Sequence, residues 1–307
     1  MLPSGCSSGT RELMTKAWNL RINGNTLQCI HPLLNILDLH NLPAQQRNMA
    51  DSFLILAINA GSSSLKLSLY TSSGEAHNPK ELCAAEVSGL SSSPASLKYH
   101  IADQSPIKGD KVPEDIKDPD GAFKFLLDKL IHDDKLPQIK KKEDIKYACH
   151  RIVHGGDFGK VHVIDKTTFD ALEELSDLAP LHNATGLAIV TTVHETLPEC
   201  VNMAYFDSAF HATIPEHIKT YAIDPKIAKK NKLRKYGFHG ISYKFITNAV
   251  AEHLGKSVDD LNIIALHLGS GASACCIKGG KSLDTTMGLT PVSGLPGGTR
   301  SGDIDPR

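Results

Sequence analysis

Residues 53–70 read FLILAINAGSSSLKLSLY, and this stretch decides the fold. Phe53 to Asn59 is a continuous apolar run, residues 61–64 are a glycine followed by three serines, and Leu65 to Tyr70 alternates apolar with polar side chains. Short apolar runs and two-residue alternation are typical of β-strands, and glycine with small polar residues is typical of a turn. The stretch therefore predicts a β-hairpin.

A second stretch repeats this design. Residues 263–268 (IIALHL) form an apolar run, Gly269-Ser270-Gly271 is turn chemistry, and residues 272–277 form a second apolar run. A third strand is predicted at 282–286 and corresponds to one predicted at 82–87 after the first hairpin. We interpret the pair as an internal duplication. Because the sequence ends soon after residue 286, we expect the second copy to lack the helices and strands that complete the first.

The segment between the hairpins predicts one α/β domain with a mixed sheet. Strands are expected at 97–102, 145–153 and 201–206, and helices at 121–130, 166–178 and 185–196. Residues 1–50 show no sustained period, so we expect an appendage there. A disordered leader, a start site assigned too early and a mitochondrial presequence all remain open.

Charge and composition exclude several classes of partner. Thirty-three basic and 34 acidic side chains leave a formal charge of −1, which favours neither nucleic acid nor an anionic membrane surface as a partner. No apolar run reaches the roughly 18 to 20 residues of a membrane helix. The seven cysteines are odd in number and form no C-x-x-C pair, which is typical of a reduced compartment. We therefore expect a cytoplasmic protein.

The two glycine turns are candidate anion sites. Backbone N–H groups and hydroxyls of residues 61–64 can point at one phosphate, and Lys66 adds a positive charge from the next strand. A single motif of this kind is more typical of a plain tight hairpin turn. The second copy, at 267–271, strengthens the functional interpretation, because two facing hairpins would enclose the phosphate tail of a nucleotide.

Phosphoryl transfer needs cations and hydrogen-bond donors around one point, and the residues that can supply them are Arg151, Arg300, His239 and His182. Arg151 follows a predicted strand. Its guanidinium group could bind a carboxylate or phosphoryl group in a bidentate manner, or form a surface ion pair. Arg300 lies in a glycine-rich loop that lets the backbone approach a ligand. His239 lies between glycines, where a turn residue is the alternative. Asp207 directly follows the strand 201–206 and could act in a site or cap a turn.

Seven motifs in order give the chain a resemblance to the acetate kinase family, of the acetate and sugar kinase, Hsp70 and actin superfamily. The resemblance covers roughly residues 53 to 307. The motifs are NAGSSSLK (59–66), HRIVHGG (150–156), LAPLHN (178–183), FDSAFHATIP (206–215), RKYGFHGIS (234–242), HLGSG (267–271) and TTMGLTPVSGLPGGTRSGDIDP (285–306).

The resemblance implies a duplicated, actin-like (ribonuclease H-like) two-domain α/β kinase fold. We expect a leader at 1–51, an N-terminal domain at 52–206, and a truncated second domain at 207–307. It also implies transfer of a phosphoryl group between ATP and acetate, with Mg²⁺ as cofactor and a homodimer when full length. The family's magnesium-binding carboxylate and adenosine pocket would lie beyond the residues given.

Roles carry over position by position. The resemblance implies catalytic roles for Asp207, which orients or deprotonates the attacking carboxyl group, and for His239 and Arg300, which stabilise the transition state. Substrate contacts are expected from Arg151, His182 and Phe210, with Val153 near the acyl group. The nucleotide phosphates would contact Ser62, Ser64, Lys66, His267, Leu268, Gly269, Ser270 and Gly271, and Asn59 would lie next to Mg²⁺.

The chain departs from the family pattern at several positions. Ser270 replaces an amide in the second hairpin, Ile241 and Tyr243 replace the usual Thr and His, and Cys149 replaces a Gly. These changes bear on nucleotide preference and rate. Three alternatives stay open: a propionate or butyrate kinase, a pyrophosphate-dependent enzyme, and a non-catalytic remnant of the fold.

Overall fold

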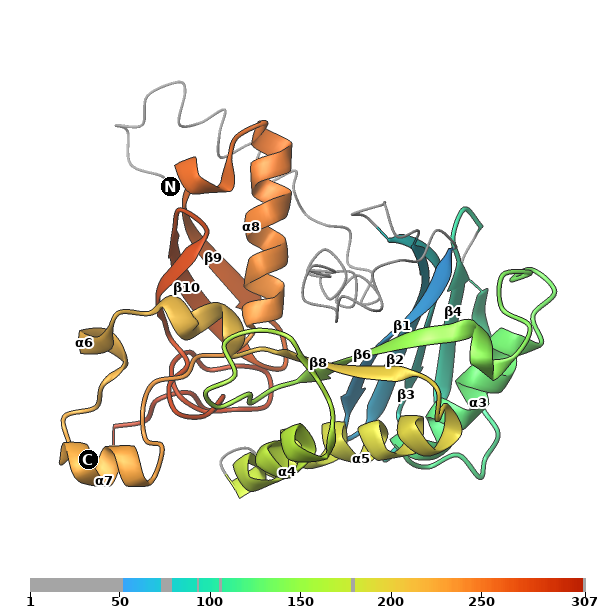
Figure 1. Cartoon of the computed structure of the whole chain (residues 1–307), viewed down its shortest axis with the longest axis horizontal. Coiled ribbons are helices and arrows are strands. Elements are labelled where there is room, and N and C mark those ends of the chain that lie inside the picture. Colours follow the sequence, from blue (N-terminus) through green and yellow to red (C-terminus); the bar gives the residue numbers. More distant parts are fainter. Residues whose placement is uncertain (1–51, 73–78, 93, 105–106, 178–179, 306–307) are drawn as a thin grey trace.

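The computed structural model describes residues 52–72, 79–92, 94–104, 107–177 and 180–305, with the backbone alone for 107–111, 177 and 180–182. The leader expected at 1–51 lies outside the described residues. In Figure 1 a large sheet with its helices lies on the right, and a smaller sheet with one long helix lies on the left.

Eight of the described strands form the first sheet, in the spatial order β5-β4-β3-β2-β1-β6-β8-β7. Strands β1 to β5 are antiparallel to their neighbours, whereas β1, β6 and β8 run parallel. The carboxyl ends of these three parallel strands therefore meet at one edge of the sheet. The strands are β1 (Phe53–Gly61), β2 (Ser64–Ser72), β3 (Lys80–Ser88), β4 (Ser96–Ile101), β5 (Ile107–Lys111), β6 (Ile145–Ile152), β7 (His162–Val163) and β8 (Val201–Phe206).

Helices α3 (Pro119–Ile131), α4 (Lys166–Glu174) and α5 (Pro180–Thr196) cover one face of this sheet (Figure 1). Alternation along β1 explains the arrangement, because Leu54, Leu56 and Ile58 lie in the core beneath α3 and α5. The intervening residues of β1 belong to a second apolar cluster on the opposite face. Helix α3 begins at Asp118, whose carboxylate accepts a hydrogen bond of 2.8 Å from Gly121 N–H.

The second part of the chain contains short helical segments, one long helix and a small sheet. The helical segments are η6 (Ala209–Thr213), α6 (Glu216–Lys219), α7 (Pro225–Lys230) and α8 (Gly240–Leu254). In the described part of the chain the small sheet has three antiparallel strands in the order β11-β10-β9. These are β9 (Asn262–Leu268), β10 (Ala272–Lys278) and β11 (Lys281–Thr285).

The predicted duplication is visible in this order. Strand β2 pairs with β1 and β3 with β2, as β10 pairs with β9 and β11 with β10. The two copies differ at the first strand: β6 occupies the second edge of β1, and no described strand occupies the corresponding edge of β9. The proposed boundary between residues 206 and 207 stays a prediction, although all strands of the first sheet precede it.

The predicted strands and helices of the first sheet are confirmed in kind. Helix α5 begins at Pro180 rather than 185, and α4 ends at Glu174 and is followed by a 3₁₀ turn. The sequence did not predict β5, whose residues IKGDK include one apolar side chain, or β7, which is too short to show a period. Helix α8 was also missed, although Gly255, with φ of 59°, marks its end in the usual way.

The small sheet has an uncovered apolar face on β9. Ile264, Leu266 and Leu268 alternate along β9 and are 72%, 55% and 69% exposed. Aligning the turns Gly61 and Gly269 matches Leu266 with Ile58, which is buried beneath the helices of the first sheet. The second copy thus presents to solvent, in the described part of the chain, a face that helices cover in the first.

Candidate active site

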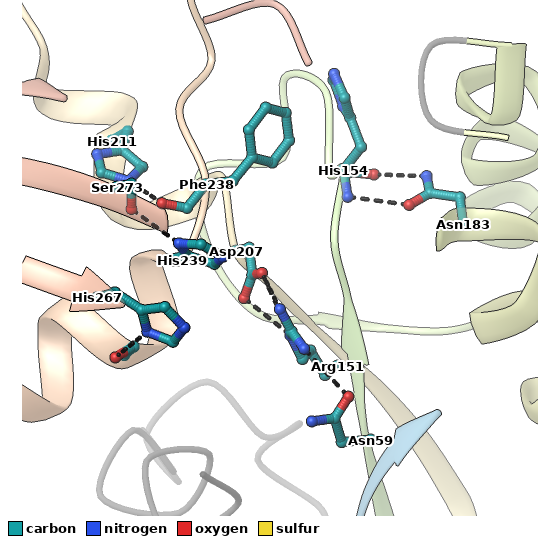
Figure 2. Close-up of polar contacts among 11 residues, drawn as sticks. Asn59, Arg151, His154, Asn183, Asp207, His211, Phe238, His239, His267 and Ser273 are labelled. Atoms are coloured by element: carbon teal, nitrogen blue, oxygen red, sulfur yellow. Dashed lines mark hydrogen bonds and ion pairs between the residues drawn. The ribbon is translucent and has the colours of Figure 1, made fainter. Parts of the chain in front are cut away.

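Arg151 and Asp207 meet at the carboxyl ends of β6 and β8, the two neighbouring parallel strands. Arg151 Nη2 lies 2.6 Å from Asp207 Oδ2, and Arg151 Nε donates to both carboxylate oxygens at 3.2 Å (Figure 2). The Asp207 side chain is 2% exposed, and that of Arg151 is 29% exposed. Asp207 N–H also donates to the carbonyl of Ile152 at 3.1 Å, which fixes the carboxylate at the end of its strand.

This ion pair keeps Asp207 ionised. Burial by itself would raise the pKa of the Asp207 carboxyl group, but the charge and hydrogen bonds of Arg151 outweigh burial and hold that pKa below its ordinary value. Asp207 is therefore a carboxylate at neutral pH. A proton acceptor and a cation thus lie side by side, with the guanidinium partly open to solvent.

The end of β1 brings Asn59 to the same cluster. Asn59 Oδ1 accepts a hydrogen bond of 3.2 Å from Arg151 Nη1. Lys66 is the cross-strand partner of Asn59, and its Nζ lies 3.5 Å from the buried Glu86 carboxylate. Ser62 is exposed and Ser64 half-buried at the turn between the two strands. The structure therefore places Asn59 in contact with Arg151, and Lys66 in an ion pair with Glu86.

His239 approaches Asp207 from the second part of the chain. It precedes α8 in the left-handed conformation, with φ of 62°, and its ring stacks on that of His267 with centroids 3.9 Å apart. The next residue, Gly240, donates its N–H to the Asp207 carbonyl at 2.9 Å. A Cβ atom at Gly240 would collide with that carbonyl oxygen and with Phe210, so glycine is required for this close approach.

Two histidines at the cluster are neutral. Burial, followed by the charges of His267, Arg151 and Arg300, lowers the pKa of His239 to about 3, although Asp207 opposes the shift. Burial also lowers the pKa of His267, whose ring senses both Asp207 and Arg151. His267 Nδ1 lies 2.9 Å from Ser242 Oγ at the start of α8. The ends of β1 and β9, which carry the two glycine turns, thus both reach the Arg151–Asp207 pair.

Arg300 reaches the cluster because its loop packs on the β9–β10 turn. The N–H groups of Gly298 and Thr299 donate to the carbonyls of Gly269 and Ser270 at 3.2 Å each. A Cβ atom at Gly271 would overlap Arg300 Nη2 and would lie 3.1 Å from His239 Nε2. Burial and then the charge of Arg151 lower the pKa of the Arg300 guanidinium. Arg300 Nη2 and His239 Nε2 therefore both lie beside the same glycine.

The structure does not bring Phe210 to this cluster. Phe210 lines a separate cavity of about 370 Å³, together with Tyr205, Ile241 and Lys244, and neither Arg151 nor Arg300 lines that cavity. Val153, expected beside Phe210, packs instead in an apolar cluster with Phe238, Tyr236 and Met287. Val153 and Phe210 thus pack in two different apolar clusters, and the substrate contact expected from Phe210 stays a prediction.

Sequence reasoning missed Phe238 and Ser273. Phe238 is buried next to His239, and Ser273 Oγ lies 2.8 Å from His239 Nδ1. The position of Phe238 in the glycine-flanked GFHG motif was the available signal, whereas nothing in the sequence singles out Ser273. The side chain of His182 lies outside the described residues. Its neighbour Asn183 bonds to the backbone N–H and carbonyl of His154 at 3.0 and 2.9 Å, which ties α5 to the loop after β6.

The described residues do not build a metal site by themselves. They contain no group of three or more His, Cys, Asp or Glu side chains that could hold an ion. The oxygen of Asn59 would be one ligand at most, so Mg²⁺ would depend on phosphate oxygens and on further ligands. The described cysteines are free, and none of the described helices has the length and apolar content to cross a membrane.

The chain has two sheets with repeated hairpins, and arginine side chains gather around a buried carboxylate where the sheets meet. These features define the class of actin-like kinase folds. The chain belongs to the acetokinase family, whose model matches residues 54–307. It is 56% identical over 253 residues to a probable acetate kinase of Chaetomium globosum, an alignment that covers 82% of this chain and 55% of that protein. The chain therefore spans about half the length of that relative.

Solved structures agree with this family. A crystal structure of Porphyromonas gingivalis acetate kinase superposes with a TM-score of 0.68 at 37% identity. A propionate kinase from Francisella tularensis subsp. tularensis gives a TM-score of 0.70 at 34% identity. Each alignment covers 83% of this chain and 62% of the solved one. The chain has the fold of these kinases over the part that it shares with them.

Proposed function

We propose that this chain carries the acid-binding and phosphoryl-transfer residues of an acetate kinase, which converts acetate and ATP to acetyl phosphate and ADP and catalyses the reverse reaction. The observation that carries the proposal is the convergence of Arg151, Asp207, His239 and Arg300 from four separate segments on one point. The 56% identity to a probable acetate kinase supports the choice of acid.

The reaction requires no general base. Acetate is already ionised at neutral pH, as an aliphatic carboxyl group is. One carboxylate oxygen forms a bond to the γ-phosphorus while the bond from that phosphorus to the β–γ bridging oxygen breaks, and ADP leaves with the bonding electrons. The partly exposed guanidinium of Arg151 binds the attacking carboxylate, and ionised Asp207 holds this guanidinium in place. Asp207 thus orients the acceptor through Arg151.

The transferred phosphoryl group lies between His239 and Arg300. Charge accumulates on its equatorial oxygens in a loose transition state, so donors fixed in advance at that point lower the barrier. Neutral His239 donates a hydrogen bond, and Arg300, whose guanidinium also lies beside Gly271, supplies a positive charge. The apolar cluster of Val153 and Phe238 is adjacent to Arg151 and His239 in sequence, and we assign the methyl group of acetate to it.

The donor nucleotide occupies the two glycine turns. Its phosphates contact residues 62–66 and 267–271, where N–H groups and hydroxyls are partly exposed. Lys66 then shares its charge between Glu86 and the phosphates. Bound Mg²⁺ would supply charge neutralisation on the phosphates, and the side-chain oxygen of Asn59 would be a candidate ligand. A homodimer is a further proposal that rests on the family alone, and a cytoplasmic location is one that rests on the cysteine pattern of the sequence.

A propionate kinase is the second candidate. The structure of the Francisella protein with that name matches this chain as well as the acetate kinase structure does. The size of the apolar cluster around Val153 would decide between the acids. Turnover on two-, three- and four-carbon acids at equal concentrations distinguishes the two functions, and pyrophosphate in place of ATP tests the third possibility.

The experiment that tests the proposal uses a chimera in which the remaining part of the Chaetomium globosum relative follows Arg307. Acetate, ATP and Mg²⁺ are added, and hydroxylamine traps acetyl phosphate as a coloured hydroxamate. We expect clear turnover from the chimera and little or none from the 307-residue chain alone. If acetate gave no hydroxamate above the blank while glycerol or a sugar was phosphorylated, the acid-kinase proposal would be wrong.

A further inference from the structure

His239 is connected to two buried hydroxyl groups that the proposed reaction does not use. Its Nδ1 lies 2.8 Å from Ser273 Oγ, and the same oxygen forms a very short hydrogen bond with Tyr243 Oη. Tyr243 and Ser273 are fully buried, and His239 is 7% exposed. Tyr243 lies one helical turn after His239 and donates its N–H to the His239 carbonyl at 3.0 Å. Ser273 comes from β10, so the three side chains join α8 to the small sheet.

The protonated hydroxyl of Tyr243 determines the direction of these hydrogen bonds. Burial raises the pKa of Tyr243 to about 12, so the phenol keeps its proton, and the backbone N–H of His267 acts on the phenol oxygen as a donor. The phenol proton therefore needs an acceptor, and among the described residues Ser273 Oγ is in position. A buried O–H group without an acceptor costs about 1–3 kcal/mol.

The hydrogen bond between Ser273 and His239 completes this chain of hydrogen bonds. Once Ser273 Oγ accepts from Tyr243, its own proton is free to donate to His239 Nδ1. An imidazole that accepts at Nδ1 carries its single proton on Nε2 when neutral. The Nε2 atom is the one that lies 3.1 Å from the Cβ position of Gly271, next to Arg300.

We propose that Tyr243 and Ser273 are positioning residues that fix His239 as the Nε2–H tautomer, so that its N–H donates toward the place where the phosphoryl group is transferred. The role in transfer rests on the proposed function, but the tautomer is a property of the chain itself. Hydrogen bonds at Nδ1 of the His239 ring thus determine that Nε2 carries the proton. Tyr243 is also one of the residues at which the chain departs from the family motif.

The charges around the ring explain why a neutral donor suits this position. Arg151 and Arg300 act on His239 with positive charge, and Asp207 acts with the opposite sign. Because Asp207 is already paired with Arg151, a charged imidazole would lie close to the like charge of Arg300. The neutral Nε2–H form gives a donor without adding to that charge.

Nitrogen NMR on the 307-residue chain with ¹⁵N-labelled histidine tests the tautomer directly. Long-range ¹H–¹⁵N correlation separates protonated from unprotonated ring nitrogens, and the His239 signals are identified by their loss in His239→Gln. We expect unprotonated Nδ1 and protonated Nε2 at neutral pH. Tyr243→Phe, which removes only the hydroxyl, and Ser273→Ala should each produce a mixture of tautomers.

Ser242→Ala is the matched control, because Ser242 contacts Nδ1 of His267 and not of His239. It should change the His267 signals and leave those of His239 in place. A protonated Nδ1 in the unmodified chain would overturn the proposal, as would a His239 spectrum that neither Tyr243→Phe nor Ser273→Ala alters. Circular dichroism of each variant establishes that the fold is retained before the spectra are compared.

Kinetics on the chimera give a second readout. Tyr243→Phe should lower kcat on the order of tenfold, equivalent to about 1.4 kcal/mol, while the KM for acetate stays within about twofold. A purely structural role of the hydroxyl would lower both stability and activity without changing the tautomer. If the unmodified chimera made no acyl phosphate, the proposed function would fail, and the NMR result would still decide the tautomer.

Discussion

Arg151 and Asp207 form a bidentate ion pair across the ends of two neighbouring parallel strands, with Nη2 2.6 Å from Oδ2. The residues are 56 positions apart in the chain. The pair holds one guanidinium edge against the carboxylate, and Nη1 bonds to Asn59. This geometry gives each partner a separate role, which mutation can distinguish.

In the chimera, Arg151→Ala should raise the KM for acetate and also lower kcat, because the guanidinium binds the attacking carboxylate and its loss leaves Asp207 buried without its cation. Steady-state kinetics with varied acetate measure both. Lys166→Ala is a suitable control, since Lys166 pairs with Asp170 at 3.0 Å and both side chains are exposed. An exposed pair of this kind contributes about 0–1 kcal/mol. Equal effects of the two substitutions would contradict the role of Arg151.

His239→Ala and Arg300→Ala should lower kcat much more than they change the KM for acetate. Donors aimed at charge that develops in the transition state contribute on the order of 10² to 10³ in rate. Initial rates at saturating acetate and ATP provide the measurement. Unchanged kcat in the Arg300 variant would remove that residue from the mechanism, whereas a rise in KM alone would assign it to substrate binding.

Gly271→Ala should reduce kcat while the protein stays folded. The new methyl group would overlap Arg300 Nη2, the end of a flexible side chain, and would lie beside His239 Nε2. Both groups would have to shift away from the transferred phosphoryl group. Gly159→Ala is the matched control, since its nearest contact would be an ordinary 3.5 Å to Ala212 Cβ and Gly159 lies outside both glycine turns. The two variants should therefore have similar melting temperatures. Their kcat values should differ, with the lower value for Gly271→Ala.

The free energy of unfolding should fall as the pH drops from about 6.5 to about 4. Burial lowers the pKa of His150 and of His211 from the ordinary 6.5 to about 4. In that range the unfolded chain binds protons that the folded chain does not, so acid favours unfolding. The loss is about 3 kcal/mol per histidine, at about 1.4 kcal/mol per pKa unit.

Urea denaturation at pH 7 and pH 4.5 measures this loss, and His150→Gln should make the difference smaller. His150 Nε2 lies 2.7 Å from Asn202 Oδ1, so an uncharged amide is the closest substitute for the buried ring. His253→Gln, on the exposed surface of α8, serves as the control. A pH dependence as steep in His150→Gln as in the unmodified chain would show that this histidine does not take part.

Leu266→Lys should reduce self-association of the 307-residue chain. Leu266 lies between Ile264 and Leu268 on the uncovered face of β9, and exposed apolar edge strands promote association. Ile227→Lys on α7 is the matched control, because Ile227 is also 55% exposed but stands outside this patch. Sedimentation at several concentrations compares the two. Equal association of both variants would show that the β9 face is not the site of contact.

The sequence by itself determined the local structure and the family. Apolar runs and alternation predicted the hairpins at 53–70 and 263–277, because the two-residue period of a strand is written in neighbouring residues. Ordered motifs led to the acetokinase family, which the family model confirmed. Patterns of this kind can be recognised in the sequence because each depends on a few adjacent side chains.

Tertiary structure alone decided which of these residues meet. Ser273 of β10 contacts His239 at the start of α8, and the Phe210 side chain lines a separate cavity. Lys66 is paired with Glu86 because strand register places them opposite each other. Such contacts join residues tens of positions apart. They depend on register and packing of whole elements, which no local pattern of side chains records.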